Sequence, residues 1–160
     1  MEGRLRQLKK GIANMSTRDA EPKLLFPALA GFYEFTSNLW YPLIRITAGV
    51  LLYPHVWPKL HHPAGVAAFM AKNGLAPAGL FAFLAIFLES VGATCITLGL
   101  FTRFFAAALA IEMAFITFIV MTPRGWEHMW PTLLWGIVFF AISLRGGGPY
   151  SVDRVIGKEL

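Results

Sequence analysis

Three ionisable residues, Arg45, Glu89 and Glu112, lie inside long apolar stretches of the sequence. A charged side chain at the centre of a membrane-spanning helix costs at least about 2.5 kcal/mol on insertion scales. Such residues face the interior of a helix bundle, pair with one another, and mark ligand sites or proton relays. Small residues follow Glu89 along the same stretch, at Gly92, Cys95 and Gly99, and would let another helix approach it.

Arg45 shares its stretch with two more groups that can carry charge, His55 and Lys59. On a straight helix Lys59 lies about 40° and His55 about 80° from Arg45 around the axis. We therefore predict one polar helix face and a coupled Arg45–Glu89 pair. Two interpretations stay open: an ion pair that fixes helix register, or a polar pocket that binds a ligand or relays protons. The second carboxyl, Glu112, exceeds what one ion pair needs and so favours the polar pocket over the ion pair, unless it contacts a partner subunit. The candidate catalytic residues are Glu89 and Arg45, and the candidate cofactor-binding residues are Arg45, Lys59, His55 and Glu112.

The remaining histidines and the single cysteine do not form a metal or redox motif. His61 and His62 are adjacent, His128 is distant, and neither HExxH nor CxxC occurs. We predict that they anchor helices at the membrane surface. Cys95 has no partner for a disulfide and is expected to be a small packing residue. No flavin, haem or metal motif is evident.

The composition predicts an integral membrane protein. Of the 160 residues, 56% are apolar and only 14% charged, against roughly 25% charged in soluble domains. Mean hydropathy is +0.58. These values exclude a disordered chain, collagen and a coiled coil, and one cysteine excludes a disulfide scaffold. The net charge of +5 is attributed to membrane topology and not to nucleic-acid binding, because the basic residues lie mostly in tails and loops.

The elements that must position these residues are four helical spans in an all-α bundle over residues 38–145. We expect the spans at about residues 39–60, 78–101, 104–121 and 130–144. Short connections make spans two to four antiparallel neighbours. In the longer first outer loop, Pro63 and Gly74 predict the start and end of a short helix.

The two ends of the chain differ from the bundle. Residues 1–37 form a basic leader with a short apolar run, broken by Pro27 and Glu34. The run is too short to span and lacks the pattern of a cleaved signal peptide, so an interfacial position is expected. Residues 146–160 are expected to form a cytoplasmic tail.

The distribution of lysine and arginine predicts the orientation. With four spans, both termini and the second loop share a side. That side carries Arg4, Arg6, Lys9, Lys10, Arg18, Lys23, Arg103, Arg145, Arg154 and Lys158, and the other carries Lys59, Lys72 and Arg124. This excess places both termini in the cytoplasm of a bacterial-type inner membrane.

Several short motifs occur in order along residues 42–153. The first span carries Arg45, Gly49 and Lys59. The second carries Glu89 and Gly92 and leads into a turn with Leu98, Gly99, Thr102 and Arg103. The fourth follows Glu127 and ends in a closure with Gly146, Gly148, Pro149, Ser151 and Asp153. Together these motifs resemble the DoxX/DoxD family of small four-span membrane proteins, although Glu112 departs from the family pattern.

The expected function follows from the family resemblance, since some members resemble the small subunit of a thiosulfate:quinone oxidoreductase. We expect a membrane subunit of a quinone-linked oxidoreductase complex, with quinone as the cofactor. The alternatives are a non-catalytic accessory subunit that stabilises a larger membrane complex and, less well supported, a small transporter. The expected partners are the lipid bilayer and other subunits of the complex or copies of the chain, and no nucleic acid.

Overall fold

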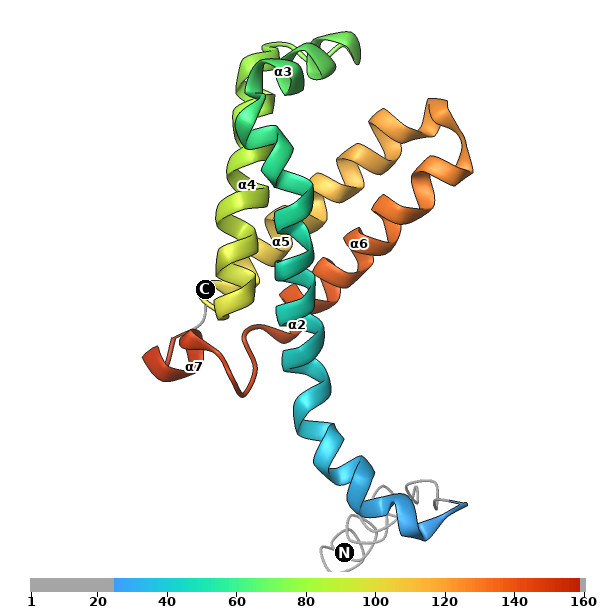
Figure 1. Cartoon of the computed structure of the whole chain (residues 1–160), viewed down its shortest axis with the longest axis vertical. Helices are drawn as coiled ribbons and strands as arrows, with labels where there is room; N and C mark the ends of the chain where they lie inside the picture. Colours follow the sequence, from blue (N-terminus) through green and yellow to red (C-terminus); the bar gives the residue numbers. More distant parts are fainter. Residues whose placement is uncertain (1–24, 159–160) are drawn as a thin grey trace, which may run out of the picture. The chain divides into compact units, whose positions relative to one another are not determined.

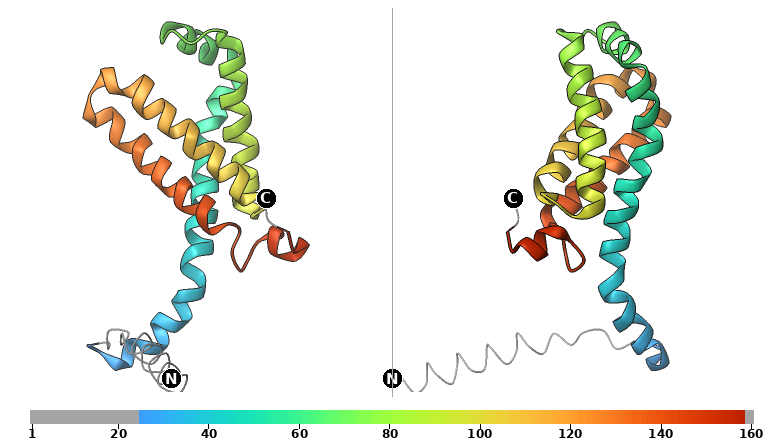
Figure 2. Two further views of the ribbon diagram at one scale, coloured as in Figure 1. Left: turned by 180° about the vertical axis from the view of Figure 1, so that it is seen from behind. Right: turned by 60° about the vertical axis from the view of Figure 1, so that its left-hand side comes forward.

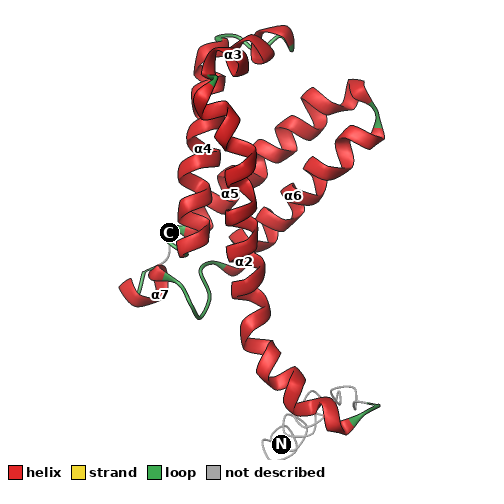
Figure 3. Cartoon of the chain, viewed as in Figure 1, coloured by secondary structure: helices red, strands yellow, loops and turns green. Residues whose placement is uncertain are grey.

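The computed structural model of the chain describes residues 25–158. Every regular element among them is a helix, and Figure 3 shows no strand in the described part. The chain divides into two units, Met1–Ser37 and Asn38–Leu160. Most of the predicted leader, with its basic residues from Arg4 to Lys23, lies outside the described residues.

The described end of the first unit is helical. A single 3₁₀ turn, η1 (Pro27–Leu29), leads into the long helix α2 (Ala30–His61), which continues into the second unit. Proline suits the first position of η1 because no hydrogen bond is required of its nitrogen there. Residues 25–35 are all exposed, so no described residue buries this part of the apolar run. Its interfacial position stays a prediction.

In the second unit, α2 is followed by α3 (Pro63–Lys72) and α4 (Ala78–Leu98). The prediction of a short helix in this loop is confirmed: Pro63 opens it, and Gly74 follows its end with φ +78°. Helix α4 begins at the predicted residue but ends at Leu98, because Gly99 adopts the left-handed conformation that closes helices.

Helix α5 (Thr102–Phe115) continues through a π-helical segment, η2 (Ile116–Met121), and a 3₁₀ turn, η3 (Thr122–Arg124). After Gly125 comes α6 (Trp126–Arg145), which begins four residues before the expected fourth span, and the chain closes with α7 (Val152–Ile156). Helices α5 and α6 lie side by side in Figures 1 and 2. The predicted antiparallel hairpin is therefore present.

Three helical segments in the described part are long and apolar enough to cross a membrane: Ala78–Leu98, Thr102–Arg124 and Trp126–Arg145. Large apolar side chains on them are exposed, among them Phe83, Ile111 and Phe140, as suits contact with lipid. Helix α2 is long enough but less apolar, since it contains Arg45, His55, Lys59 and three prolines. The apolar segments thus account for three of the four expected spans, and a four-span bundle is not established by them.

All four long helices nevertheless contribute to one apolar core in the second unit. Its buried residues come from α2 (Tyr41, Ala48, Leu52), α4 (Ala93, Cys95, Ile96), α5 (Phe105, Ala106, Leu109, Ala110, Met113) and α6 (Phe139, Ile142). Cys95 is a buried free thiol, in agreement with its expected packing role. At Gly49 the backbones of α2 and α4 approach so closely that a Cβ would lie 2.8 Å from the Ala93 oxygen. Only glycine permits this approach.

Candidate functional site

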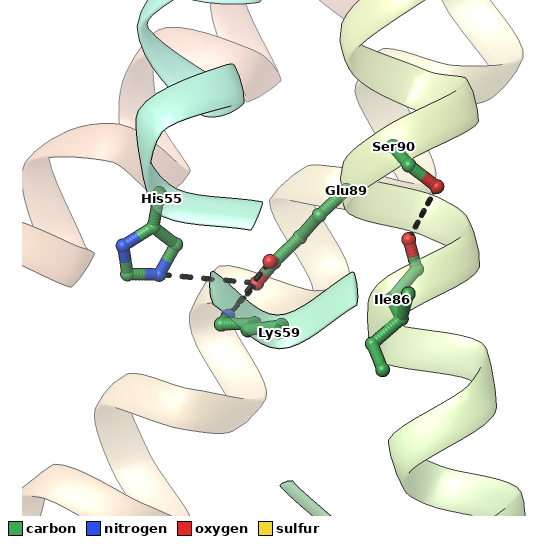
Figure 4. A network of polar contacts seen from close by, with 5 residues as sticks. All are labelled: His55, Lys59, Ile86, Glu89 and Ser90. Carbon is green, nitrogen blue, oxygen red and sulfur yellow. Dashed lines mark hydrogen bonds and ion pairs between the residues drawn. The ribbon is translucent and has the colours of Figure 1, made fainter. Parts of the chain in front are cut away.

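The first polar group of the second unit joins α2 to α4 through Glu89 (Figure 4). The Lys59 Nζ donates to both carboxylate oxygens of Glu89, at 2.5 Å to Oε1 and 2.7 Å to Oε2. His55, one helical turn before Lys59, brings Nε2 to 4.0 Å from Oε1. Glu89 has no exposed side-chain surface, whereas 24% of the Lys59 side chain is exposed. The carboxylate is thus deeply buried and its cation reaches it from the more open side.

The close approach of α2 and α4 positions these side chains. Beyond Gly49, the hydroxyl groups of Tyr53 and Thr94 bond at 2.9 Å. Nearly two turns further along α2, Lys59 is level with Glu89. Beside Glu89, the Ser90 hydroxyl donates to the carbonyl of Ile86 at 2.6 Å and so turns away from the carboxylate. Glu89 therefore depends on Lys59 for its hydrogen bonds among the described residues.

Glu112 of α5 adds a second carboxyl to this region. Both of its oxygens are buried and find no hydrogen-bond partner among the described residues. It is close enough to Glu89 and Lys59 to interact with both electrostatically. One turn later the helix changes to the π-helical segment η2, a form that often occurs at functional sites. We call Lys59, Glu89, His55 and Glu112 the carboxyl cluster.

The predicted pairing of Arg45 with Glu89 is wrong. The Arg45 guanidinium donates to the carbonyls of Ile96 (2.7 Å) and Thr97 (3.1 Å) through one nitrogen, and to that of Tyr150 (2.5 Å) through the other. Arg45 is only 1% exposed, and its Nε has no partner among the described residues. A role of Arg45 toward a bound ligand stays a prediction.

Depth along the helix explains the error. Arg45 and Lys59 do lie on the side of α2 that faces α4, but they are 14 residues apart, which is roughly 21 Å at 1.5 Å per residue. Arg45 is level with the last turn of α4, where carbonyls have no partner within the helix. A guanidinium satisfies such carbonyls and complements the negative end of the helix dipole. The angular spacing thus indicated the correct face of α2, whereas the height of Arg45 along the helix decides which group it meets.

The segment after α6 is bound to the helix ends through Asp153, and its cytoplasmic location stays a prediction. Asp153 is 1% exposed and accepts hydrogen bonds from the backbone of Phe101 (2.7 Å) and Thr102 (2.9 Å) and from the Thr102 hydroxyl (2.7 Å). It thereby caps the start of α5, while its own backbone N–H donates to Gly99. The sequence signal was present in the closure ending at Asp153, but spacing alone did not reveal its partner.

Gly99 lies between these groups and has φ +72°. A Cβ there would overlap the Arg45 guanidinium and the Ser151 side chain. Nearby, Arg103 donates to the carbonyls of Ser143 (3.2 Å) and Leu144 (2.7 Å) in the last turn of α6. We call Arg45, Arg103 and Asp153, with the backbone groups they bind, the capping network.

Two of the other histidines contact carbonyls four residues before them in the chain. His61 contacts the Trp57 oxygen at 2.9 Å, and His128 contacts that of Arg124 at 3.1 Å. In the part of the chain that the structure describes, no three histidine, cysteine, aspartate or glutamate side chains come together as a metal site would require. The carboxyl cluster is therefore the candidate site.

Comparison with known proteins agrees with the motif resemblance. A family model described as DoxX matches residues 41–122, which include every residue of the carboxyl cluster and Arg45. The closure with Asp153 lies beyond the match. No curated protein and no solved structure matches the chain.

Proposed function

The chain belongs to the DoxX family, and on that premise we propose that it is a membrane subunit of a quinone-linked oxidoreductase complex. In this proposal the carboxyl cluster exchanges protons with a quinone, and a redox partner in the complex exchanges the electrons. Reduction of a quinone to a quinol consumes two electrons and two protons, so the site needs a route for protons, and a buried acid beside the head group can provide one.

The proposal depends on one observation: the carboxyl cluster buries two carboxyl groups beside a single lysine. Lys59 is one cation beside two carboxyls, and both hydrogen bonds that its Nζ donates go to Glu89. The Glu112 oxygens are buried and without a partner among the described residues. A buried carboxyl in that state is costly unless it holds a proton or meets a donor from a ligand. A quinone oxygen would accept that proton, and a quinol hydroxyl would donate to the same carboxyl.

The other predicted site residues receive separate roles. Lys59 holds Glu89 in place and offers N–H donors to a quinone oxygen, while His55, 4.0 Å from Glu89, is placed to pass protons to and from the exposed side. We assign Arg45 a positioning role, since its guanidinium fixes the end of α4.

The test uses the complex purified from native membranes with Glu89→Gln, Glu112→Gln or the control Glu127→Gln. We expect both cluster variants to assemble and to lose quinone-linked turnover by at least about tenfold, the lower range for a proton-transfer group. Glu127 lies at the start of α6 and is exposed, so its variant should retain turnover. Full turnover in intact complexes of both cluster variants would refute the proposal.

A second function, a non-catalytic accessory subunit, is favoured by a different observation. Lys59 contacts both Glu89 oxygens, and such a bidentate pair is suited to fixing the register of α2 against α4. If this is its only role, Glu89→Gln and Lys59→Met should reduce the amount of assembled complex, and the complexes that survive should have full turnover.

We also propose four spans with α2 as the first, over residues 39–60, and both termini in the cytoplasm of an inner membrane. The proposal is supported by the buried α2 residues in the common core and by the lysine and arginine excess on one side. Gly65→Cys tests it in a Cys95→Ala background, because a Cβ at Gly65 meets no atom within 4 Å. An impermeant thiol reagent should label it in intact cells, and labelling only after permeabilisation would reverse the orientation.

A further inference from the structure

The end of α6 carries a basic pocket that the proposed function does not use. The pocket has a volume of about 410 Å³, and three cationic residues line it: Arg145, Arg154 and Lys158. Ligand pockets in proteins measure about 300–1,000 Å³, so there is room for a phosphate with part of the molecule that carries it.

Among the described residues, the lining of the pocket has a net positive charge, with three cations and one carboxylate. Its acidic lining residue is Asp153, whose two oxygens already accept hydrogen bonds from Phe101 and Thr102. Within residues 25–158, the ion pairs of the structure are those of Glu89 with Lys59 and His55, so none neutralises Arg145, Arg154 or Lys158. The pocket therefore attracts an anion from outside the chain.

One of the three cations is held in place by aromatic rings. The Arg145 guanidinium carbon lies 4.6 Å from the centroid of the Trp40 ring and 4.6 Å from that of Tyr41. Tyr41 in turn donates to the carbonyl of Gly146, just past Arg145. The Ser151 hydroxyl donates to the carbonyl of the lining residue Gly148 at 2.8 Å. These contacts position part of the pocket before any ligand binds.

The location points to a lipid. Arg145 is the last residue of the candidate span Trp126–Arg145, and Asp153 ties the pocket to the start of α5 and the end of α4. The pocket thus lies at the level where the spans leave the hydrocarbon. Phosphates of anionic lipids lie at this level, and basic pockets between spanning helices bind them. Trp40 and Tyr41 are of the types enriched there.

We propose that this pocket binds the phosphate of an anionic phospholipid headgroup, with Arg145, Arg154 and Lys158 as the binding cations. The proposal is independent of the quinone-linked role, because no residue of the carboxyl cluster takes part in it.

The test measures lipid binding to the full chain in a non-ionic detergent, by native mass spectrometry and by the rise in melting temperature. The probes are phosphatidylglycerol, phosphatidylcholine and inorganic phosphate. The pocket variant is Arg154→Gln with Lys158→Gln, both exposed residues. Its control is Lys72→Gln with Arg124→Gln, which removes the same charge from two exposed residues that do not line the pocket.

We expect phosphatidylglycerol to bind and to raise the melting temperature, and phosphatidylcholine to do neither. Each basic residue near anionic lipid strengthens binding about fivefold, so the pocket variant should bind roughly 30-fold more weakly. The control variant should match the wild-type chain. Equal loss in the pocket and control variants would overturn the proposal in favour of unspecific charge attraction, and so would unchanged binding by the pocket variant. A full response to inorganic phosphate alone would overturn the lipid assignment.

Discussion

Two regions of the second unit bury charge in different ways. In the capping network, the charged groups of Arg45, Arg103 and Asp153 bind backbone atoms at the ends of α4, α6 and α5. In the carboxyl cluster, Lys59 and Glu89 bind each other, and the Glu112 oxygens bind nothing among the described residues. In the first region the charged groups bind backbone groups that the fold holds in place, whereas the second region has more carboxyl groups than lysines to pair with them.

The difference indicates where chemistry can occur. Backbone carbonyls and N–H groups at helix ends stay where the helices place them and do not titrate, so charges bound to them serve stability. Pairs of side chains can exchange protons and accept a ligand in place of a partner. We therefore expect variants of the capping network to affect folding, and the Glu89→Gln and Glu112→Gln variants of the carboxyl cluster to affect turnover more than stability.

The largest expected effect is that of Arg45→Met. The substitution removes the donor of the Thr97 and Tyr150 carbonyls. It also removes the shorter of two bonds to the Ile96 carbonyl, which keeps the Gly99 N–H at 3.3 Å. Each unsatisfied buried group costs about 1–3 kcal/mol, and hydrogen bonds from a charged group are the stronger ones. We expect a loss of at least about 3 kcal/mol in the free energy of unfolding, measured by denaturation in detergent. Arg45→Lys keeps the positive charge but loses the second donor nitrogen of the guanidinium, so the loss in the free energy of unfolding should be smaller than for Arg45→Met. A loss of under about 1 kcal/mol for Arg45→Met would contradict the capping role.

Lys59→Met should have the next largest effect, because it leaves the Glu89 carboxylate buried and unpaired. Breaking a fully buried pair costs about 3–5 kcal/mol, and the partial exposure of Lys59 reduces our expectation to about 2–3 kcal/mol. Glu89→Gln in the same chain should recover much of that loss. Arg45→Met and Glu89→Gln share no partner, so their losses should add. Coupled losses for Arg45→Met with Glu89→Gln, or additive losses for Lys59→Met with Glu89→Gln, would reverse the assignment of partners.

Gly99→Ala tests how tightly the capping network is built. A side chain at φ +72° is strained, and its Cβ would displace the Arg45 guanidinium and Ser151. We expect a loss of about 1–3 kcal/mol in detergent unfolding. Gly65→Ala is the matched control, since it lies in α3 with open space around it, and alanine is favoured over glycine in a helix. Equal effects of the two substitutions would mean that the network tolerates a shift.

The smallest effect on stability is expected from Glu112→Gln. The carboxyl makes no hydrogen bond to the described residues, and the neutral amide has nearly the same shape. The free energy of unfolding should change by less than about 1 kcal/mol, while quinone-linked turnover falls as proposed above. A loss above about 2 kcal/mol would show that Glu112 has a partner, supplied by another subunit or by lipid.

The positions of the helices could largely be predicted from sequence. Apolar runs of spanning length gave α4, α5 and α6, and Pro63 with Gly74 gave α3, because these signals are local. The start of α2 at Ala30 was missed, since Glu34 interrupts the apolar run without interrupting the helix, and Pro27 lies in η1 just before it. Prolines at 42, 54 and 58 likewise lie inside α2. Local rules predict breaks that a long helix can absorb.

The sequence by itself determined which residues are candidates for function, because a charge in an apolar run is costly wherever the helix is placed. It thus identified Arg45, Glu89, Glu112 and Lys59. It did not determine which of these side chains pair, since that depends on how far along their axes two helices are in contact. That position is set by the contact of Gly49 with α4 and by Asp153, 51 residues beyond its partner Thr102. Only the tertiary structure decided that Arg45 binds carbonyls at the end of α4 and that Glu89 pairs with Lys59.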